Sequence, residues 1–440
     1  MSTTKSARAV ALATLIRVWR DGSYSNISLN NSFRSSDLSQ TDRNFTTRLV
    51  YGTIQEKIYL EFQLQDLVKT KLKEDYLWPL LLMSAYQLLF MDKVPNRAVL
   101  NEANILAKQF GKPHSTGFKI VNGILRALLR RGRVLPQVTA PDYLVVKESM
   151  PVWLVQYLVD HWGAERAASI LASVNEPAKN TVRISQLVSA TEVVTALNDL
   201  GFAPCESQMT AQEVVLDHGG ISDSELFKEG KLTIQDEAAS LAVSAFNFTG
   251  DEEVLDACSA PGGKTIQLAE QLSAGRVTAL DIHQNKLRLV QKSSQRMNVA
   301  SKVKTQKMDA RFAKEVFQPG QFDKILVDAP CSGLGLLRRK PEIRYNKSLA
   351  DLTKLQKVQL AILNQVSSLL NDKGELVYST CTFTVEEDEY VVQAFLSDNP
   401  QFKLQPFETG KIAAPNGMVK ILPDEYGSDG FFIAKFVVRG

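Results

Sequence analysis

Hydrophobic residues recur at helical spacing through the first third of the chain. They do so in two stretches, formed by Val10, Leu12, Leu15, Ile16 and Trp19 and by Leu49, Tyr51, Ile54 and Ile58. The same period predicts further helices over 76–91, 97–110 and 115–131, and no alternating strand pattern interrupts them. Residues 1–136 are therefore expected to form an all-α domain.

The pattern changes after a linker at 135–141. The elements predicted beyond it are two short helices, a strand, a third helix and further strands, at 151–162, 164–173, 181–184, 190–199 and on the approach to Gln235. This mixture of helices and strands indicates a small α/β module over 137–234, which is expected to link the flanking domains or to bind RNA beside them.

Short apolar strands alternate with helices from residue 235 to residue 440. The predicted strands are 253–256, 276–281, 303–308, 323–328 and 374–379, and the predicted helices are 264–272, 284–297 and 349–370. Such alternation is typical of a parallel sheet with helices on both faces. We therefore expect a multidomain protein in which an all-α domain and a small α/β module precede an α/β Rossmann-like domain.

Length and composition agree with this division. At about 150 residues per domain, the 440 residues correspond to three domains, and 44% hydrophobic with 22% charged residues excludes disordered and fibrous classes. The most apolar stretch, 77–91, is shorter than the roughly 20 residues that span a bilayer. The N-terminus has no continuous apolar signal segment. We therefore expect a cytoplasmic protein without a membrane partner.

The four cysteines do not suggest a metal site or a disulfide framework. Cys205, Cys258, Cys331 and Cys381 are at least 50 residues apart, without a C-x-x-C pair or a histidine at ligand spacing. Reduced thiols in a reducing compartment fit this pattern better than disulfides, and no metal is expected.

Charge is distributed unevenly, although the net charge is only +3. Residues 1–135 hold 20 Lys and Arg against 10 Asp and Glu, whereas the remainder holds 31 against 38. A basic domain attached to an acidic one is typical of nucleic-acid binding, and Arg130 and Arg131 at the end of the helix 115–131 are candidates to contact phosphates. A basic helical domain that binds a protein, or that only keeps the chain soluble, remains the alternative.

Small and acidic residues follow the first three predicted strands of the C-terminal domain. The first strand runs into Cys258, Ser259, Ala260, Pro261, Gly262, Gly263 and Lys264, where a ligand could approach the backbone before a helix begins. The second strand ends at Asp281, where a carboxylate can bind a ribose, and the third ends at Asp309, which can reach an adenine edge. The series favours a nucleoside cofactor over a bare turn and two helix-capping aspartates.

Two cysteines follow the fourth and fifth predicted strands. Cys331 stands in Asp328-Ala329-Pro330-Cys331-Ser332-Gly333, and Cys381 stands in Ser379-Thr380-Cys381-Thr382. Buried, inert cysteines are the alternative. The polar neighbours and the position of both residues in loops at the ligand-binding edge of the sheet instead favour a chemical role.

These motifs together resemble the bacterial 16S rRNA 5-methylcytosine methyltransferases of the RsmB/Sun/Fmu type. The resemblance rests on Gln235–Ser240, Asp256–Lys264, Asp328–Gly333 and Ser379–Thr382. The first third resembles the RNA-binding domain of the antitermination factor NusB at Asp42-Arg43, Tyr51–Thr53, Val94-Pro95, Asn101-Glu102 and Val121–Arg126. One departure is Ser259, where many relatives have alanine, and a hydroxyl is expected to be tolerated there.

The resemblance implies a mechanism. Carbon 5 of cytosine is a poor nucleophile, so a thiolate must first add to carbon 6. The nucleophile is implied to be Cys381, while Asp328 holds or protonates ring nitrogen 3 and Cys331 assists release of the covalent adduct. DNA cytosine methyltransferases take their nucleophile from the Pro-Cys motif instead, so both cysteines have to be considered.

The resemblance also implies S-adenosylmethionine as cofactor. Cys258–Lys264 would surround its methionine part, Asp281 its ribose and Asp309 its adenine, with Asp328 beside them. Arg338, Arg339 and Arg344, shortly after the Cys331 loop, would hold the RNA backbone, unless they form only a solvated basic loop.

The implied partner is 16S rRNA, free or in a small-subunit assembly intermediate, and the enzyme is expected to be a monomer. The implied target is cytosine 967. The alternatives are the same chemistry on tRNA or on another rRNA site, and a non-catalytic RNA-binding assembly factor.

Overall fold

The computed structural model describes residues 6–439, which form two compact units. The helical unit contains the chain up to Asn175 together with Leu337–Asn346, and the sheet unit contains Glu176–Leu336 and the chain from Lys347 onward. Among the described residues, no helix has both the length and the apolar character needed to cross a membrane.

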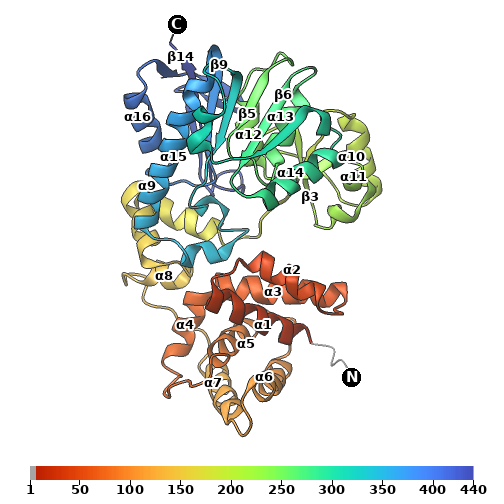
Figure 1. The fold of residues 1–440 in the computed structure, drawn as a ribbon. Coiled ribbons are helices and arrows are strands. Elements are labelled where there is room, and N and C mark those ends of the chain that lie inside the picture. Colours follow the sequence, from red (N-terminus) through yellow and green to blue (C-terminus); the bar gives the residue numbers. More distant parts are fainter. Residues whose placement is uncertain (1–5, 440) are drawn as a thin grey trace. The chain divides into compact units, whose positions relative to one another are not determined.

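The helical unit is all-α (Figure 1), as predicted for its part within residues 1–136, and it also contains residues that the prediction gave to the other two domains. Its helices are α1 (Ala7–Asp21), α2 (Ser25–Arg34), α3 (Gln40–Gln55), α4 (Lys57–Gln65), α5 (Leu77–Phe90), α6 (Asn96–Phe110), α7 (Gly117–Arg131), α8 (Tyr143–Lys147) and α9 (Val152–Ser173). Helix α5 is apolar almost throughout and packs against α3, α6 and α7. Gly52 lets α3 approach α5, because a Cβ there would lie 2.2 Å from the Tyr86 hydroxyl oxygen.

Helix α9 contains the break that the sequence predicts. Gly163 has a φ of 77°, a conformation that ends one helix and starts another. The predicted pair of helices at 151–162 and 164–173 is therefore confirmed.

The first part of the sheet unit is a small α/β layer. Its strands are β1 (Asn180–Ile184), β2 (Cys205–Glu206), β3 (Glu213–Leu216) and β4 (Leu232–Ile234), with helices α10 (Ala190–Asp199) and α11 (Glu225–Lys228) and the short turn η1 (Ile221–Asp223). The strands pair antiparallel in the order β2-β3-β1-β4. Val182, Leu197, Leu216 and Leu232 form part of its own core.

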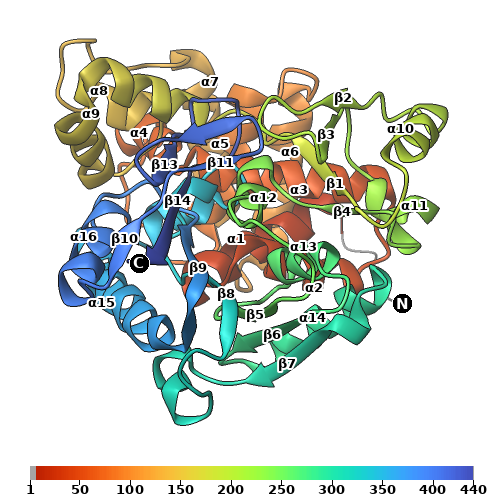
Figure 2. The ribbon, with the colours of Figure 1, turned by 90° about the horizontal axis from the view of Figure 1, so that it is seen from above.

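The main sheet has the order β10-β14-β9-β8-β5-β6-β7, with β13 paired to β14 (Figure 2). Its strands are β5 (Glu253–Asp256), β6 (Arg276–Asp281), β7 (Val303–Lys307), β8 (Phe322–Asp328), β9 (Leu370–Thr380), β10 (Phe402–Leu404), β13 (Met418–Ile421) and β14 (Phe431–Val438). Strands β5–β9 are parallel, as predicted, whereas β14 runs antiparallel to β9. The five predicted strands are therefore confirmed as parallel, and β10, β13 and β14 add an antiparallel edge that the sequence analysis did not predict.

Helices cover both faces of this sheet. They are α12 (Glu237–Ser244), α13 (Gly263–Gln271), α14 (Gln284–Arg296), α15 (Leu349–Val366) and α16 (Glu389–Asp398), and β11 (Phe407–Thr409) and β12 (Ile412–Ala414) form a separate ribbon. Besides η1, the short 3₁₀ helices of the sheet unit are η2 (Ala300–Lys302), η3 (Ala310–Glu315), η4 (Leu334–Leu336) and η6 (Ser367–Leu369), whereas η5 (Pro341–Tyr345) belongs to the helical unit.

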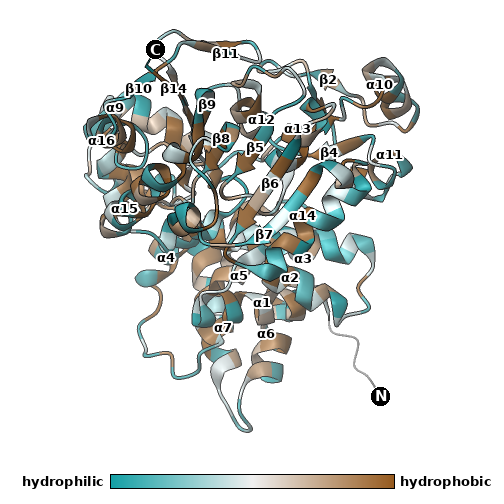
Figure 3. Cartoon of the chain, turned by 45° about the horizontal axis from the view of Figure 1, so that its top comes forward, coloured by the Kyte–Doolittle hydropathy of each residue, from teal (hydrophilic) through white to brown (hydrophobic). Residues whose placement is uncertain are grey.

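Alternate residues of the strands enter two separate cores. Ile325 and Tyr378 pack in the cluster that contains residues of α15 and α16, whereas Leu326 and Val377 pack in the cluster that contains residues of α12 and α13. Helix α14 buries only a narrow stripe and is largely hydrophilic (Figure 3). Because helices cover both faces, the faces of the sheet are buried, and its carboxyl edge is the part that remains open to ligands.

Candidate active site

Cys331 and Cys381 lie side by side at the carboxyl edge of the main sheet. Their loops follow β8 and β9, which are adjacent parallel strands with Asp328 opposite Ser379 in the register. Both cysteines are free thiols, and their Sγ atoms are 2.9 Å apart. The structure therefore brings together two predicted residues that stand 50 positions apart in the sequence.

A glycine fixes the loop of Cys331 against that of Cys381. The N–H of Gly335 donates to the Cys381 carbonyl at 3.0 Å, and the Gly430 N–H donates to the Gly335 carbonyl at 3.0 Å. A Cβ at Gly335 would lie 1.9 Å from the Gly430 carbonyl oxygen, so a side chain cannot fit there.

The contact between the sulfurs affects the protonation of Cys331. The hydrogen bond with Cys381, together with burial, raises the pKa of Cys331 well above its usual value. Cys331 therefore stays a thiol at neutral pH, and its S–H is close enough to donate to the Cys381 sulfur.

Asp328 lies beside the cysteines in a charged pair with Lys264. Its Oδ2 is 2.9 Å from the Lys264 Nζ, and its Oδ1 accepts a hydrogen bond from the Ser379 Oγ at 2.9 Å. Burial lowers the pKa of Lys264, but the Asp328 charge and hydrogen bond outweigh it, so the pKa is raised. The Lys264 ammonium also lies 4.9 Å from the ring centroid of Phe431. Phe431 belongs to β14, a strand that the sequence analysis did not predict.

The loop Cys258–Lys264 connects β5 to α13 as predicted. The Ser259 N–H and Oγ both donate to the Leu280 carbonyl, at 2.8 and 2.9 Å, which ties the loop to β6. Gly262 has a φ of 113°, and a Cβ there would lie 3.1 Å from the Cα of Val290. Within residues 6–439 no side chain caps the first turn of α13, so its N–H groups can face a ligand.

Asp256 lies buried beneath this loop. Its Oδ2 accepts from the Thr265 Oγ1 at 2.6 Å, and its Oδ1 has no hydrogen-bond partner within the described part of the chain. Burial raises the pKa of Asp256 to about 7. Burial also raises the pKa of Cys258, which lies in the same loop, well above its usual value. A buried oxygen without a partner at this edge is what a polar ligand would satisfy.

Asp281 and Asp309 bond to the backbone that follows their strands. The Asp281 Oδ1 accepts from the His283 N–H at 2.7 Å, within the turn that precedes α14, and is not the cap of that helix. Asp309 caps η3: it accepts from the Arg311 N–H at 3.0 Å and pairs with the Arg311 guanidinium at 2.6 Å, a hydrogen bond that lowers the pKa of Asp309. The capping alternative therefore holds for Asp309 alone. Both carboxylates lie at strand ends, where a nucleoside cofactor would lie.

Arg344 is a correction to the predicted RNA contacts. Its side chain is 0% exposed, and its guanidinium donates to Gln55 O, Ser149 O and Asn175 Oδ1 at 3.1, 3.2 and 3.1 Å inside the helical unit. It therefore stabilises the packing of that unit and does not present a charge to RNA.

The other predicted basic residues differ in exposure. Arg130 is exposed and Arg339 is half-buried. Arg338 is half-buried and donates from its Nε to the Ser173 carbonyl at 2.7 Å, and Arg131 donates to the Gln63 carbonyl. Contacts of these four residues with RNA stay a prediction.

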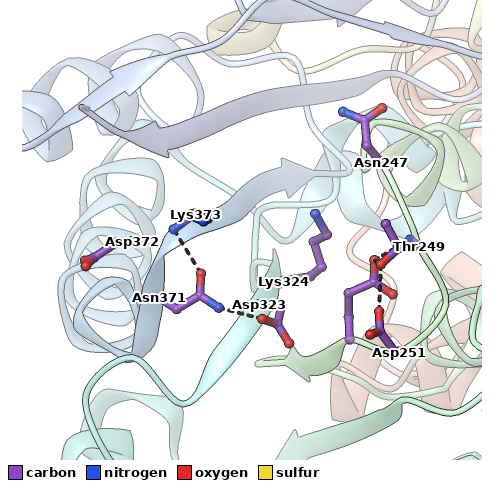
Figure 4. Close-up of a pocket in the computed structure, with 9 residues that line it drawn as sticks. Asn247, Thr249, Asp251, Asp323, Lys324, Asn371, Asp372 and Lys373 are labelled. Atoms are coloured by element: carbon purple, nitrogen blue, oxygen red, sulfur yellow. Dashed lines mark hydrogen bonds between the residues drawn. The ribbon is translucent and has the colours of Figure 1, made fainter.

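A pocket of about 610 Å³ lies at the opposite, amino edge of the sheet (Figure 4). It is lined by Asn247, Thr249, Asp251, Glu252, Asp323, Lys324, Asn371, Asp372 and Lys373. Several of these groups bond to one another, as Asn371 does with Asp323 at 2.5 Å (Figure 4). None of the predicted site residues lines it.

The fold and the carboxyl edge define an S-adenosylmethionine-dependent methyltransferase. The strands β7-β6-β5-β8-β9, the glycine-containing loop after β5 and the aspartates after β6 and β7 fit such a cofactor. The chain belongs to the 16S rRNA methyltransferase RsmB/F family, whose model matches residues 243–437. The NusB family model matches 5–130, and the model of the ferredoxin-like domain of RsmF/B-like methyltransferases matches 150–221.

Known proteins similar to the chain agree with this family. The chain is 36% identical to the Probable ribosomal RNA small subunit methyltransferase B of Bacillus subtilis, with 99% of each chain covered. It is 30% identical to the Ribosomal RNA small subunit methyltransferase B of Serratia proteamaculans, with 91% of each covered. Among solved structures, PH0851 covers 99% of both chains with a TM-score of 0.84 at 24% identity, which supports the fold. A methyltransferase homolog from Pyrococcus horikoshii has a TM-score of 0.59 at 28% identity, and the match covers 67% of this chain and 97% of that one. The predicted resemblance and the three kinds of domain are therefore confirmed.

Sequence reasoning missed a buried carboxylate between the two cysteine loops. Glu387 is 0% exposed and bonds to the backbone of Ser332, 55 positions away. It lies in the acidic run 386–389, which is typical of a solvated turn. Its distance of six residues from Cys381 was the signal available in the sequence.

Proposed function

We propose that this enzyme methylates carbon 5 of one cytosine in 16S rRNA through a transient covalent bond between Cys381 and the base. The observation that carries the proposal is the pair of free thiols whose sulfurs lie 2.9 Å apart beside the Asp328–Lys264 pair. The family match supports the rRNA substrate. Cytosine 967 is the position that the resemblance suggests.

Addition of Cys381 activates the base. Its thiolate sulfur bonds to carbon 6, and the electron pair of the ring double bond moves toward carbon 5, which becomes nucleophilic. Asp328, held by Lys264 and Ser379, binds or protonates ring nitrogen 3 and stabilises the electron-rich ring. Bound S-adenosylmethionine supplies a methyl group on a positively charged sulfur, and Cys258–Lys264, Asp281 and Asp309 would hold it.

Release reverses the addition. A solvent water molecule takes the proton from carbon 5, the carbon–hydrogen electron pair forms the ring double bond again, and the bond between carbon 6 and sulfur breaks with its electron pair returning to the Cys381 sulfur. The Cys331 S–H, in contact with that sulfur, stabilises the departing thiolate by hydrogen bonding. The target base has to leave its stack to reach the sulfurs, so an unpaired nucleotide is the less costly substrate.

Trapping on RNA that contains 5-fluorocytidine tests this proposal, because fluorine on carbon 5 prevents release. We expect the wild-type enzyme to stay covalently attached, Cys381→Ser to form no adduct, and Cys331→Ala to accumulate adduct on ordinary RNA. An adduct formed by Cys381→Ser would overturn the assignment of the nucleophile.

The remaining parts of the proposal concern the surroundings of the reaction. The basic first third and its NusB match support RNA binding by the helical unit. We propose a cytoplasmic, monomeric enzyme that acts on free rRNA or on an assembly intermediate. Cofactor binding without methyl transfer to any ribosomal RNA would favour a non-catalytic assembly factor, and methylation of tRNA alone would favour another substrate.

A further inference from the structure

A buried carboxylate connects the loops of the two cysteines. Glu387 lies between the Cys381 loop and α16 and is fully buried. Its backbone carbonyl accepts a hydrogen bond from the Tyr378 hydroxyl at 2.5 Å, which anchors it to β9. Its side chain therefore starts from a fixed backbone position.

The carboxyl group accepts hydrogen bonds from both loops. Its Oε1 accepts from the backbone N–H of Ser332, which directly follows Cys331, at 2.7 Å. Its Oε2 accepts from the Oγ1 of Thr384, three residues after Cys381, at 2.8 Å. One side chain thus bonds to a neighbour of each cysteine.

A glutamine from α15 completes this arrangement. The Gln359 Nε2 donates to the Glu387 Oε1 at 3.1 Å and to the Pro330 carbonyl at 3.0 Å. Pro330 directly precedes Cys331, so hydrogen bonds hold the loop on both sides of that cysteine. The hydroxyls of Ser332 and Thr382, 2.9 Å apart, form a second bond between the loops.

The charge of Glu387 also acts on Cys331. After the hydrogen bond with Cys381 and burial, the Glu387 charge is among the groups that raise the pKa of Cys331. A carboxylate at this place therefore favours the thiol form of Cys331, which is the form that can donate to the Cys381 sulfur.

We propose that Glu387 is a positioning residue that sets the contact between the two cysteine sulfurs and thereby controls release of the covalent adduct. This inference rests on the proposed function. Glu387 acts through Ser332 and Thr384, and it does not touch the base. Formation of the adduct needs the Cys381 sulfur, whereas release also needs the Cys331 thiol beside it. Loss of Glu387 is therefore expected to slow release more than addition.

The test compares Glu387→Gln with Glu375→Gln. Glu375 is a matched control because it is a buried carboxylate near the other end of β9, bonded to Lys435 and Lys324, outside the site. For each variant we would measure thermal stability, kcat and KM for S-adenosylmethionine, adduct formation on 5-fluorocytidine RNA, and the steady-state fraction of adduct on ordinary RNA.

For Glu387→Gln we expect kcat to fall about tenfold to a hundredfold, as for misplaced reacting groups, with KM for S-adenosylmethionine within about twofold. Adduct should form on the fluorinated RNA and accumulate on ordinary RNA, whereas Glu375→Gln should not accumulate it. A Glu387→Gln variant that matches Glu375→Gln in adduct accumulation would overturn the positioning role. A wild-type enzyme that forms no adduct on fluorinated RNA would instead overturn the proposed function itself.

A second pair of variants applies if Glu387→Gln does not fold. Thr384→Val removes the hydroxyl that bonds to Glu387, whereas Thr384→Ser retains it. We expect Thr384→Val to accumulate adduct on ordinary RNA and Thr384→Ser to behave like the wild type. Equal adduct fractions for the two variants would contradict the proposal.

Discussion

Buried polar groups at the amino edge of the main sheet are more completely bonded than those at its carboxyl edge. At the amino edge, Glu375 bonds to Lys435, Lys324 and Asn247, at 2.6, 2.9 and 3.0 Å. Burial would raise the pKa of Glu375, but these bonds outweigh it, so the pKa is lowered. At the carboxyl edge, the Oδ1 of Asp256 has no partner within residues 6–439, and the pKa values of Asp256 and Cys331 are raised.

This difference in bonding distinguishes groups that stabilise the fold from groups that are available for a reaction. A fully bonded network has little left to offer a ligand, whereas buried groups with incomplete bonding and shifted pKa values are typical of functional sites. The polar pocket at the amino edge (Figure 4) therefore does not compete with the cysteine pair as the site of reaction.

Lys435→Met should give the largest loss of stability. It leaves the buried Glu375 carboxylate with one cation fewer, and breaking such a pair costs about 3 kcal/mol of unfolding free energy. Urea denaturation measures this loss, and kcat of the folded variant should stay within about twofold of wild type. A tenfold fall in kcat without a change in stability would reverse the roles assigned to the two edges.

Lys264→Met, at the carboxyl edge, should lower activity strongly and stability little, the reverse of Lys435→Met. The Lys264–Asp328 pair is partly exposed, with side chains 13% and 30% exposed, so the unfolding free energy should change by less than about 1 kcal/mol. Asp328 loses the ammonium that holds its carboxylate in place at 2.9 Å, and kcat/KM should fall about a hundredfold. Methyl transfer assays measure this fall. An unchanged kcat/KM would contradict a role of this pair in the reaction.

The two edges should also differ in the sign of their pH dependence. Burial raises the pKa of Asp388 to about 8, even though Lys420 lies 3.0 Å away. Asp388 therefore binds more protons in the folded state, and its stabilising contribution is present at acid pH and decreases as the pH rises toward 8. Glu375, with its lowered pKa, contributes stability at neutral pH that is lost in acid.

Urea denaturation at pH 5 and pH 8 measures this difference. The advantage in stability of wild type over Asp388→Asn should shrink by about 1 kcal/mol or more between these pH values, whereas the advantage of wild type over Glu375→Gln should not shrink. Asp388→Asn keeps the ion pair between Lys420 and Glu389, at 2.7 Å, so the comparison isolates the titrating group. A constant advantage over Asp388→Asn would contradict the raised pKa.

The sequence predicts the elements of the carboxyl edge well because their signals are local. Short apolar runs that end in Asp281 or Asp328 identify strands β6 and β8. In the small α/β layer, helical periodicity likewise predicts α10 with the bounds that the structure has. The order of parallel strands then places Cys331 beside Cys381 by topology. The antiparallel edge was missed although the apolar run Phe431–Val438, which forms β14, is a local strand signal. The pairing of β14 with β9 and its antiparallel direction are the parts that no local pattern encodes.

Interior charges were the least predictable features. The basic run that contains Arg344 and the acidic run that contains Glu387 both look solvated in sequence, yet both side chains are 0% exposed. Their partners, such as Gln55 and Ser332, lie far away in the chain. Long-range hydrogen bonds can offset the cost of burying a charge, and they leave no period or motif in the sequence.

The smallest expected effect concerns the bonding of Asp256. Thr265→Val removes the hydroxyl that donates to the Oδ2 of Asp256, so residue 265 no longer supplies a donor to this carboxyl group. The unfolding free energy should fall by about 1 kcal/mol, and the Kd for S-adenosylmethionine should rise about threefold because the carboxyl group beneath the loop is less well oriented. Calorimetric titration of the variant measures the affinity. An unchanged affinity would show that Asp256, although incompletely bonded in the wild type, only stabilises the loop. The contrast between the two edges would then rest on the cysteines and on the Asp328–Lys264 pair.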